Sequence, residues 1–93
     1  MFNRRFNLPE DTPFKYNELE EELLEKFHSV KIMKFGNIDD SGCSYYIGCK
    51  EYFGDYKYES GYCSTKELAM EDLFIQNYKD EEIKEIVKHV YKL

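Results

Sequence analysis

The chain has 93 residues and a formal net charge of −6 at pH 7, from 19 acidic and 13 basic side chains. This length predicts a single domain. Direct binding to DNA or RNA and binding to an anionic membrane are both disfavoured, because lysine and arginine supply the contacts to such surfaces. Nine tyrosines and seven phenylalanines can nonetheless build a core, since each buried ring removes about 150–250 Å² from water.

The cysteines and the hydropathy pattern predict a cytoplasmic protein. There are three cysteines, an odd number, which argues against the paired disulfides of small secreted domains. No apolar stretch approaches the length of about 18 residues that a membrane span needs, and no signal-peptide core is recognisable. We therefore expect reduced thiols and no membrane association.

Residues 1–16 are expected to form an extended N-terminal arm, and residues 17–93 a single α+β domain. Pro9 and Pro13 interrupt any helix in the arm. The arm should pack against the domain through its large apolar side chains, which are Phe2, Phe6, Leu8 and Phe14.

A first helix is predicted to begin at Asn17, a favourable N-cap residue, with Glu20 three positions later in the reciprocal capping position. Its apolar side chains recur at helical spacing and form one stripe, made of Leu19, Leu23, Leu24 and Phe27. The rest of its surface is almost wholly acidic, with one Lys26 against Glu18, Glu20, Glu21, Glu22 and Glu25. This helix should therefore carry −4 of the net charge.

A first strand is expected over residues 30–35, where β-branched and aromatic residues partly alternate. A turn over residues 37–42 follows. Residues 42–63 then predict a β-hairpin that turns at the pair Gly54-Asp55, which is typical of a two-residue hairpin loop.

The two-residue loop fixes a register in which Lys50 faces Glu59 and Gly48 faces Gly61. One face of this hairpin is the expected core face, with Tyr45, Ile47, Cys49, Phe53, Tyr56, Tyr58 and Tyr62. The other face is expected to be wetter, with Tyr46, Lys50, Tyr52, Lys57, Glu59 and Cys63. A slip of one residue would exchange the two faces.

A second helix is predicted after Ser64, as its N-cap, with Glu67 again three residues on. It is apolar on one broad face and also on the opposite side, at Leu68 and Ile75. A last helix over residues 80–93, with Ile83, Ile86, Val87 and Val90 on one stripe, is expected to cover that second side.

The predicted order is therefore arm-α-β-β-β-α-α, an α+β domain with a three-stranded antiparallel sheet and helices packed on one face. This order resembles the double-stranded RNA-binding domain, which runs α-β-β-β-α. That family opens its second helix with a lysine-rich phosphate-binding motif, whereas residues 64–70 (STKELAM) here keep the single Lys66. The resemblance therefore implies the order of elements and no RNA binding.

Two groups of residues have the types, but not the context, of known chemical sites. Asp55-Tyr56-Lys57 resembles the acid-x-lysine element of the PD-(D/E)xK nucleases, with Asp39 or Asp40 as the upstream acid. A turn favours aspartate at position 55 for conformational reasons alone. Zinc ligands could come from Cys43, Cys49, Cys63, His28 and His89, but the close cysteine spacing of structural zinc sites is absent. We expect no enzyme activity, no metal and no cofactor.

The acidic surface is the remaining candidate for function. Carboxylates at spacings of several ångström can imitate duplex phosphates, and the expected phosphate mimics are Glu18, Glu21, Glu22, Glu25, Asp39 and Asp40. A small, acidic, tyrosine-rich chain without catalytic motifs resembles the class of small phage-encoded inhibitors of restriction or CRISPR nucleases, several of which mimic DNA. The resemblance implies a protein partner that binds nucleic acid, and a homodimer would lengthen the acidic surface.

Two other interpretations remain open. The acidic face could serve solubility alone, as charged helix surfaces commonly do. Alternatively, the chain could be an interaction module or small subunit that docks through apolar surface, including Leu68, Ile75 and exposed tyrosines.

Overall fold

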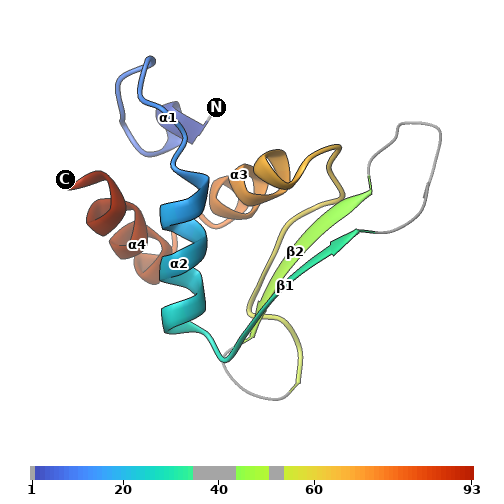
Figure 1. Cartoon of the computed structure of the whole chain (residues 1–93). Helices are drawn as coiled ribbons and strands as arrows, with labels where there is room; N and C mark the ends of the chain where they lie inside the picture. Colours follow the sequence, from blue (N-terminus) through green and yellow to red (C-terminus); the bar gives the residue numbers. More distant parts are fainter. Residues whose placement is uncertain (1, 35–43, 51–53) are drawn as a thin grey trace.

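The computed structural model describes residues 2–34, 44–50 and 54–93. The elements within them are α1 (Phe2–Arg5), α2 (Tyr16–Lys26), β1 (Ser29–Lys34), β2 (Tyr45–Lys50), β3 (Tyr58–Glu59), α3 (Lys66–Gln76) and α4 (Glu81–Tyr91). The strands form one antiparallel sheet in the order β1-β2-β3. The predicted α+β class with a three-stranded antiparallel sheet is therefore confirmed (Figure 1).

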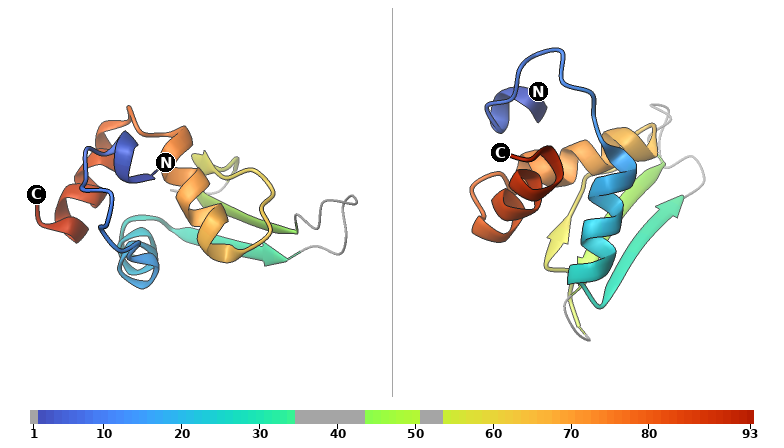
Figure 2. Two further views of the ribbon diagram at one scale, coloured as in Figure 1. Left: turned by 90° about the horizontal axis from the view of Figure 1, so that it is seen from above. Right: turned by 60° about the vertical axis from the view of Figure 1, so that its left-hand side comes forward.

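The helices pack on one side of the sheet. Helix α3 lies on β2, while α2 packs between α4 and the neighbouring strand β1 (Figures 1 and 2). The core is formed where these elements meet, and all of the following side chains are fully buried in it: Leu19, Leu23, Ile47, Cys49, Ala69, Met70, Leu73, Phe74, Ile83 and Ile86. The predicted stripes of the second and last helices are thus confirmed as core faces.

The sequence predicts an extended N-terminal arm, and this prediction is wrong at its start, because residues Phe2–Arg5 form the single helical turn α1. Its apolar side chains are buried as expected: Phe2, Phe6 and Leu8 belong to the core. The Phe2 ring contacts Phe74 of α3 at 6.1 Å between centroids. Pro9 and Pro13 lie after α1 and so do not oppose this turn, which brings Phe2 and Phe6 to the core against α3.

Two of the predicted N-caps are wrong by one or two positions. Helix α2 begins at Tyr16, so Asn17 lies inside the helix. The N-cap residue is Lys15, whose side chain forms no capping hydrogen bond. Burial of the Tyr16 side chain against the core extends the helix beyond the capping signal. In α3 the cap is Thr65, whose hydroxyl accepts a 3.1 Å hydrogen bond from the Leu68 N–H, and not Ser64.

The predicted hairpin register is also wrong. Gly48 pairs with Glu59 and Cys49 with Tyr58, so the ladder is shifted by two residues and Lys50 does not face Glu59. Across the other edge of β2, Lys50 pairs with Ser29 of β1. A shift of two keeps the faces, so Ile47, Cys49 and Tyr58 point into the core as predicted. Partners assigned to residues 51–53 lie outside the described residues.

One extra residue then reverses the faces towards the end of the hairpin. Tyr45 bridges Cys63, so two residues of β2 lie opposite residues 60–62, as in a β-bulge. Tyr62 is therefore 51% exposed rather than in the core, and its ring lies 5.6 Å from that of Tyr46 on the outer face. Tyr56 also packs there, with its centroid 5.8 Å from Tyr46.

The last helix does not cover the second apolar side of α3, contrary to prediction. Helix α4 packs along α2. Leu68 is consequently 47% exposed, and Ile75 is half-buried. The apolar stripe of α4 is buried in the core. Its side chains therefore do not cover the surface of α3 around Leu68 and Ile75.

Candidate functional site

Helix α2 presents glutamates on the side opposite its core contacts. Leu19 and Leu23 are fully buried, which fixes the rotation of the helix about its axis. At ~100° per residue, Glu18, Glu21 and Glu25 then fall within an arc of about 60° that faces solvent. All three side chains are exposed. We call Glu18, Glu21 and Glu25 the acidic stripe.

The acidic stripe has no internal neutralisation. Among the ion pairs between described residues, none involves Glu18, Glu21 or Glu25. Spacings of three and four residues bring these like charges together along the helix, which costs about 0.2–0.5 kcal/mol per pair. Glu25 additionally lies in the last turn, where the helix dipole disfavours a negative charge. Glu18, in the first turn, interacts favourably with the helix dipole, so it is Glu21 and Glu25 that lower the stability of the helix.

Glu22 differs from the other predicted phosphate mimics. Its side chain is only 17% exposed, and Oε1 lies 3.1 Å from Nε2 of His89 in α4. The residue thus helps to join α2 to α4 and borders the acidic stripe on one flank. Asp39 and Asp40 lie outside the described residues.

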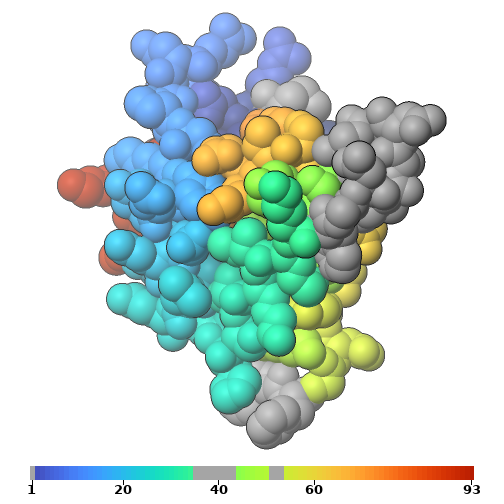
Figure 3. Space-filling view, turned by 45° about the vertical axis from the view of Figure 1, so that its right-hand side comes forward, coloured from blue at the N-terminus to red at the C-terminus, as the bar shows by residue number. Residues whose placement is uncertain are grey.

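One acidic side chain from a second helix, Glu67 of α3, lies near α2 on the side of Tyr16 and Glu20. Burial raises the pKa of Tyr16, and the nearby carboxylates of Glu20 and Glu67 raise it further. Glu67 belongs to the first turn of α3. The start of α3 and the edge of the sheet border α2 on the face shown in Figure 3. Sequence reasoning missed Glu67, because only tertiary packing brings it near α2.

The face is not uniformly acidic, because α2 also exposes a leucine and the adjoining strand exposes lysines. Leu24, predicted for the buried stripe, is instead 55% exposed. It follows the buried Leu23 in sequence, about 100° further round the helix. Lys31 and Lys34 are exposed on β1, an edge strand, where lysine discourages pairing with another chain.

A second surface gathers the apolar residues of the docking alternative. Tyr62, Leu68 and Ile75 line one shallow groove of about 400 Å³. Glu71 and Asp72 form its polar border. Asp72 is held in place, since Oδ2 accepts hydrogen bonds from the Gly61 N–H at 2.6 Å and from Gln76 Nε2 at 2.7 Å.

The residues considered for nuclease or zinc chemistry are dispersed. Asp55 is exposed in the loop before β3, while Lys57 Nζ donates a 3.0 Å hydrogen bond to Glu82 of α4. Cys49 is buried in the core as a free thiol, and Cys63 is half-buried in the segment before α3. In residues 2–34, 44–50 and 54–93, no three histidine, cysteine or acidic side chains are grouped as a metal site. Cys43 lies outside these residues.

No helix of the described segments combines the length and the apolar character that crossing a bilayer requires. The chain matches no protein-family model, no curated protein and no solved structure.

Proposed function

We propose that this chain is a non-enzymatic binding protein whose acidic stripe occupies the basic nucleic-acid groove of a partner protein in the cytoplasm. The partner class would be a nucleic-acid-binding enzyme, such as a host restriction or CRISPR nuclease. One observation carries the proposal: Glu18, Glu21 and Glu25 are exposed on one side of a helix whose other side is anchored in the core.

The charge density of α2 supports a mimic of duplex phosphates. The three glutamates of the acidic stripe span seven residue steps, or about 10.5 Å of helix axis at 1.5 Å per residue, so they lie about 5 Å apart along the axis. One strand of DNA carries a charge about every 3.4 Å along the axis. A groove that is lined with lysine and arginine for a phosphate backbone would therefore meet carboxylates at comparable density.

The energetics of the helix also support a binding role. Solubility needs charged residues of either sign, and alternating signs would stabilise the helix through pairs four residues apart. In the acidic stripe the neighbouring carboxylates instead repel one another, and none of them forms an ion pair among the described residues. A basic partner surface would relieve that repulsion on binding.

The test is a pull-down from bacterial lysate with the immobilised chain at low salt, followed by elution in a salt gradient. We expect a nucleic-acid-binding protein that elutes at moderate salt, because ions screen charges beyond about 8–10 Å at 0.1–0.15 M. The eluted partner is identified by mass spectrometry, and its nuclease activity is measured with and without the chain.

Two charge-matched variants make the test specific. Glu21→Lys with Glu25→Lys should abolish capture of the partner. Asp55→Lys with Glu85→Lys changes the net charge equally at two exposed sites outside the acidic stripe and should leave capture intact. Equal capture by both variants would refute the role of the acidic stripe, provided that both keep the circular dichroism spectrum of the parent.

Docking through the groove of Tyr62, Leu68 and Ile75 is the second candidate, favoured by the exposure of Leu68 beside Tyr62. Leu68→Asp should then release a partner that persists at high salt. Leu24→Asp is its matched control, because Leu24 is similarly exposed on α2. A partner that resists salt and is lost only with Leu68→Asp would replace the first proposal.

A further inference from the structure

A hollow of about 320 Å³ lies where α1, the connection between α3 and α4, and α4 meet. Four of its lining side chains are cationic: Arg5, Lys79, Lys84 and Lys88. Of the residues that the structure describes, no aspartate or glutamate lines it. Such a concentration of positive charge is unexpected in a chain with 19 acidic and 13 basic residues.

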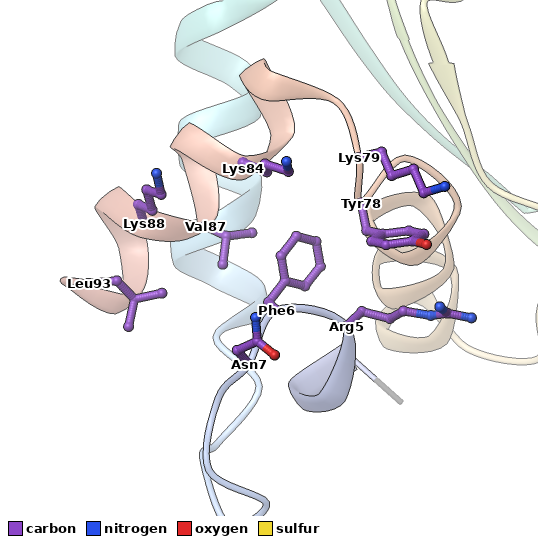
Figure 4. A pocket seen from close by; sticks show the side chains of 9 residues that line it. All are labelled: Arg5, Phe6, Asn7, Tyr78, Lys79, Lys84, Val87, Lys88 and Leu93. Atoms are coloured by element: carbon purple, nitrogen blue, oxygen red, sulfur yellow. The ribbon is translucent and has the colours of Figure 1, made fainter.

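The interior of the hollow is apolar. Phe6 and Val87 point into it from opposite sides (Figure 4). Both are core residues, with exposed fractions of 9% and 1%. Their positions are therefore fixed by packing. Phe6 supplies the small accessible part of this apolar floor, Val87 supports it from beneath, and the exposed Leu93 lies at its border.

An aromatic ring forms one side of the hollow and is held between two cations. The guanidinium carbon of Arg5 lies 4.8 Å from the centroid of the Tyr78 ring, and Lys79 Nζ lies 5.7 Å from it. Figure 4 shows the ring between these two side chains. Cation–π attraction on both sides orients the ring at the edge of the hollow.

Two lysines one turn apart on α4 form the other side. Lys84 Nζ lies 3.5 Å from Glu81 and Lys88 Nζ 3.8 Å from Glu85. These pairs are solvent-exposed, so they contribute little and an incoming anion can replace them. A phosphate monoester carries a charge of about −1.5 to −2 and several acceptor oxygens, so one phosphate can contact both lysines where each carboxylate contacts only one.

We propose that this hollow binds a small phosphate monoester with an aromatic or other apolar body. The dianionic phosphate would sit at Lys84 and Lys88 on α4, because lysine is a usual partner of phosphate oxygens. The body of the ligand would pack on the accessible part of the Phe6 ring, beside the Tyr78 ring. The volume is near the lower end of ligand pockets, which run from about 300 to 1,000 Å³, and it limits the ligand to a small molecule.

The proposal is tested by titrating the full chain, labelled with nitrogen-15, with phenyl phosphate, inorganic phosphate and phenol, and following the backbone amide signals. Phenyl phosphate should give saturable shifts at Asn7, Tyr78 and Val87. Inorganic phosphate should bind at the same amides but roughly tenfold more weakly, because it lacks the apolar body. Phenol should produce no saturable shift. Equal affinity for the two phosphates, or no saturation with phenyl phosphate, would overturn the proposal.

A pair of charge-matched variants separates the hollow from general anion attraction. Lys84→Gln with Lys88→Gln should weaken phenyl phosphate binding by roughly tenfold or more. Lys31→Gln with Lys66→Gln alters the net charge equally at exposed sites outside the hollow and should leave the affinity unchanged. Equal weakening by both pairs would show non-specific attraction and refute the site. The amide spectrum of each variant itself reports that the fold is retained.

Discussion

The hydroxyl of Tyr58 donates a 2.6 Å hydrogen bond to Oδ1 of Asp80, which joins strand β3 to the start of helix α4. The same oxygen caps the helix, since it accepts the N–H groups of Glu82 at 2.9 Å and Ile83 at 3.2 Å. Tyr58 is almost fully buried. Burial first, and the hydrogen bond to Asp80 second, raise the pKa of Tyr58. One carboxylate thus fixes both the helix start and a buried tyrosine.

Asp80→Ala should lower the free energy of unfolding by about 2 kcal/mol. Loss of an N-cap costs about 0.5–2 kcal/mol, and a buried hydroxyl that loses its partner costs about 1–3 kcal/mol. Glu82 offers Tyr58 a longer alternative at 3.3 Å, which moderates the second loss. Urea unfolding measures the change, with Asp55→Ala at an exposed loop position as the control. A difference within about 0.5 kcal/mol between these variants would contradict the dual role of Asp80.

The contribution of Asp80 should also depend on pH. The hydrogen bond from Tyr58, foremost, holds the pKa of Asp80 below its usual value. The unfolded chain therefore binds this proton more readily, so the stabilisation is complete above about pH 4 and is lost as pH falls through the lower folded pKa. The stability gap between the parent and Asp80→Asn, from urea midpoints, should be constant from about pH 7 to 5 and shrink below about pH 4. A gap that widens on acidification would contradict this assignment.

The helices could be predicted because their apolar spacing alone decides which side is buried. Ile83, Ile86 and Val87 are buried as their spacing of three and four residues requires. Leu24 shows the limit of that rule. It extends the apolar stripe of α2 in the sequence, yet no neighbouring element reaches it, so it is exposed. The spacing of apolar residues predicts on which side of a helix a side chain lies, but not whether a neighbouring element covers it.

The hairpin was harder to predict because hydrogen bonds from side chains set its register. Ser60 donates its N–H to the Ile47 carbonyl at 2.9 Å, and its hydroxyl accepts the Ile47 N–H at 2.8 Å. Asp72 of α3 then accepts the N–H of Gly61. These bonds satisfy the backbone at the extra residue and make the bulge tolerable. Nothing local in residues 60–62 signals a partner in α3.

The two candidate surfaces also differ in how far the sequence predicts them. The acidic stripe could be predicted because its glutamates lie on one helix, although the pairing of Glu22 with His89 could not. The cationic hollow could not be predicted, since Arg5 and Lys88 are more than 80 positions apart in sequence and meet only through packing of α1 near α4.

Gly48 should be intolerant of a side chain only while Tyr56 is present. A Cβ at Gly48 would lie 2.6–2.9 Å from atoms of the Tyr56 ring, which covers it. Gly48→Ala should therefore lower the free energy of unfolding by about 1–3 kcal/mol. In a Tyr56→Ala background the same change should be neutral or stabilising by up to about 1 kcal/mol, because alanine suits a strand better than glycine. The double-mutant cycle, measured by urea unfolding, contradicts this packing if the two effects add.

Cys49 should be almost inert in the native protein. Its side chain is fully buried, and burial raises the pKa of the thiol to about 12. Because the thiolate is the reactive species, its population at pH 8 falls roughly 1,000-fold relative to a thiol with the usual pKa of 9.0. Alkylation of Cys49 by iodoacetamide at pH 8, mapped by mass spectrometry, should be at least about tenfold slower in the native protein than in the protein unfolded by urea. Equal rates in the two states would mean that Cys49 opens to solvent readily in the native protein.

Glu25→Gln should stabilise the protein and weaken its binding to a partner at the same time. The substitution removes a negative charge from the last turn of α2, where the dipole disfavours it by about 0.3–1 kcal/mol. It also removes the repulsion from Glu21, which adds about 0.2–0.5 kcal/mol. Urea unfolding at low ionic strength should show the gain, and the gain should shrink in 1 M salt because exposed charges are screened.

Glu85→Gln is the control, since it removes an exposed glutamate that pairs with Lys88 and should not stabilise. If Glu25→Gln stabilises without weakening capture of the partner, the charge of Glu25 serves solubility and not binding. If it does not stabilise, the repulsion inferred for the acidic stripe is wrong, because no other described group offsets the charge of Glu25.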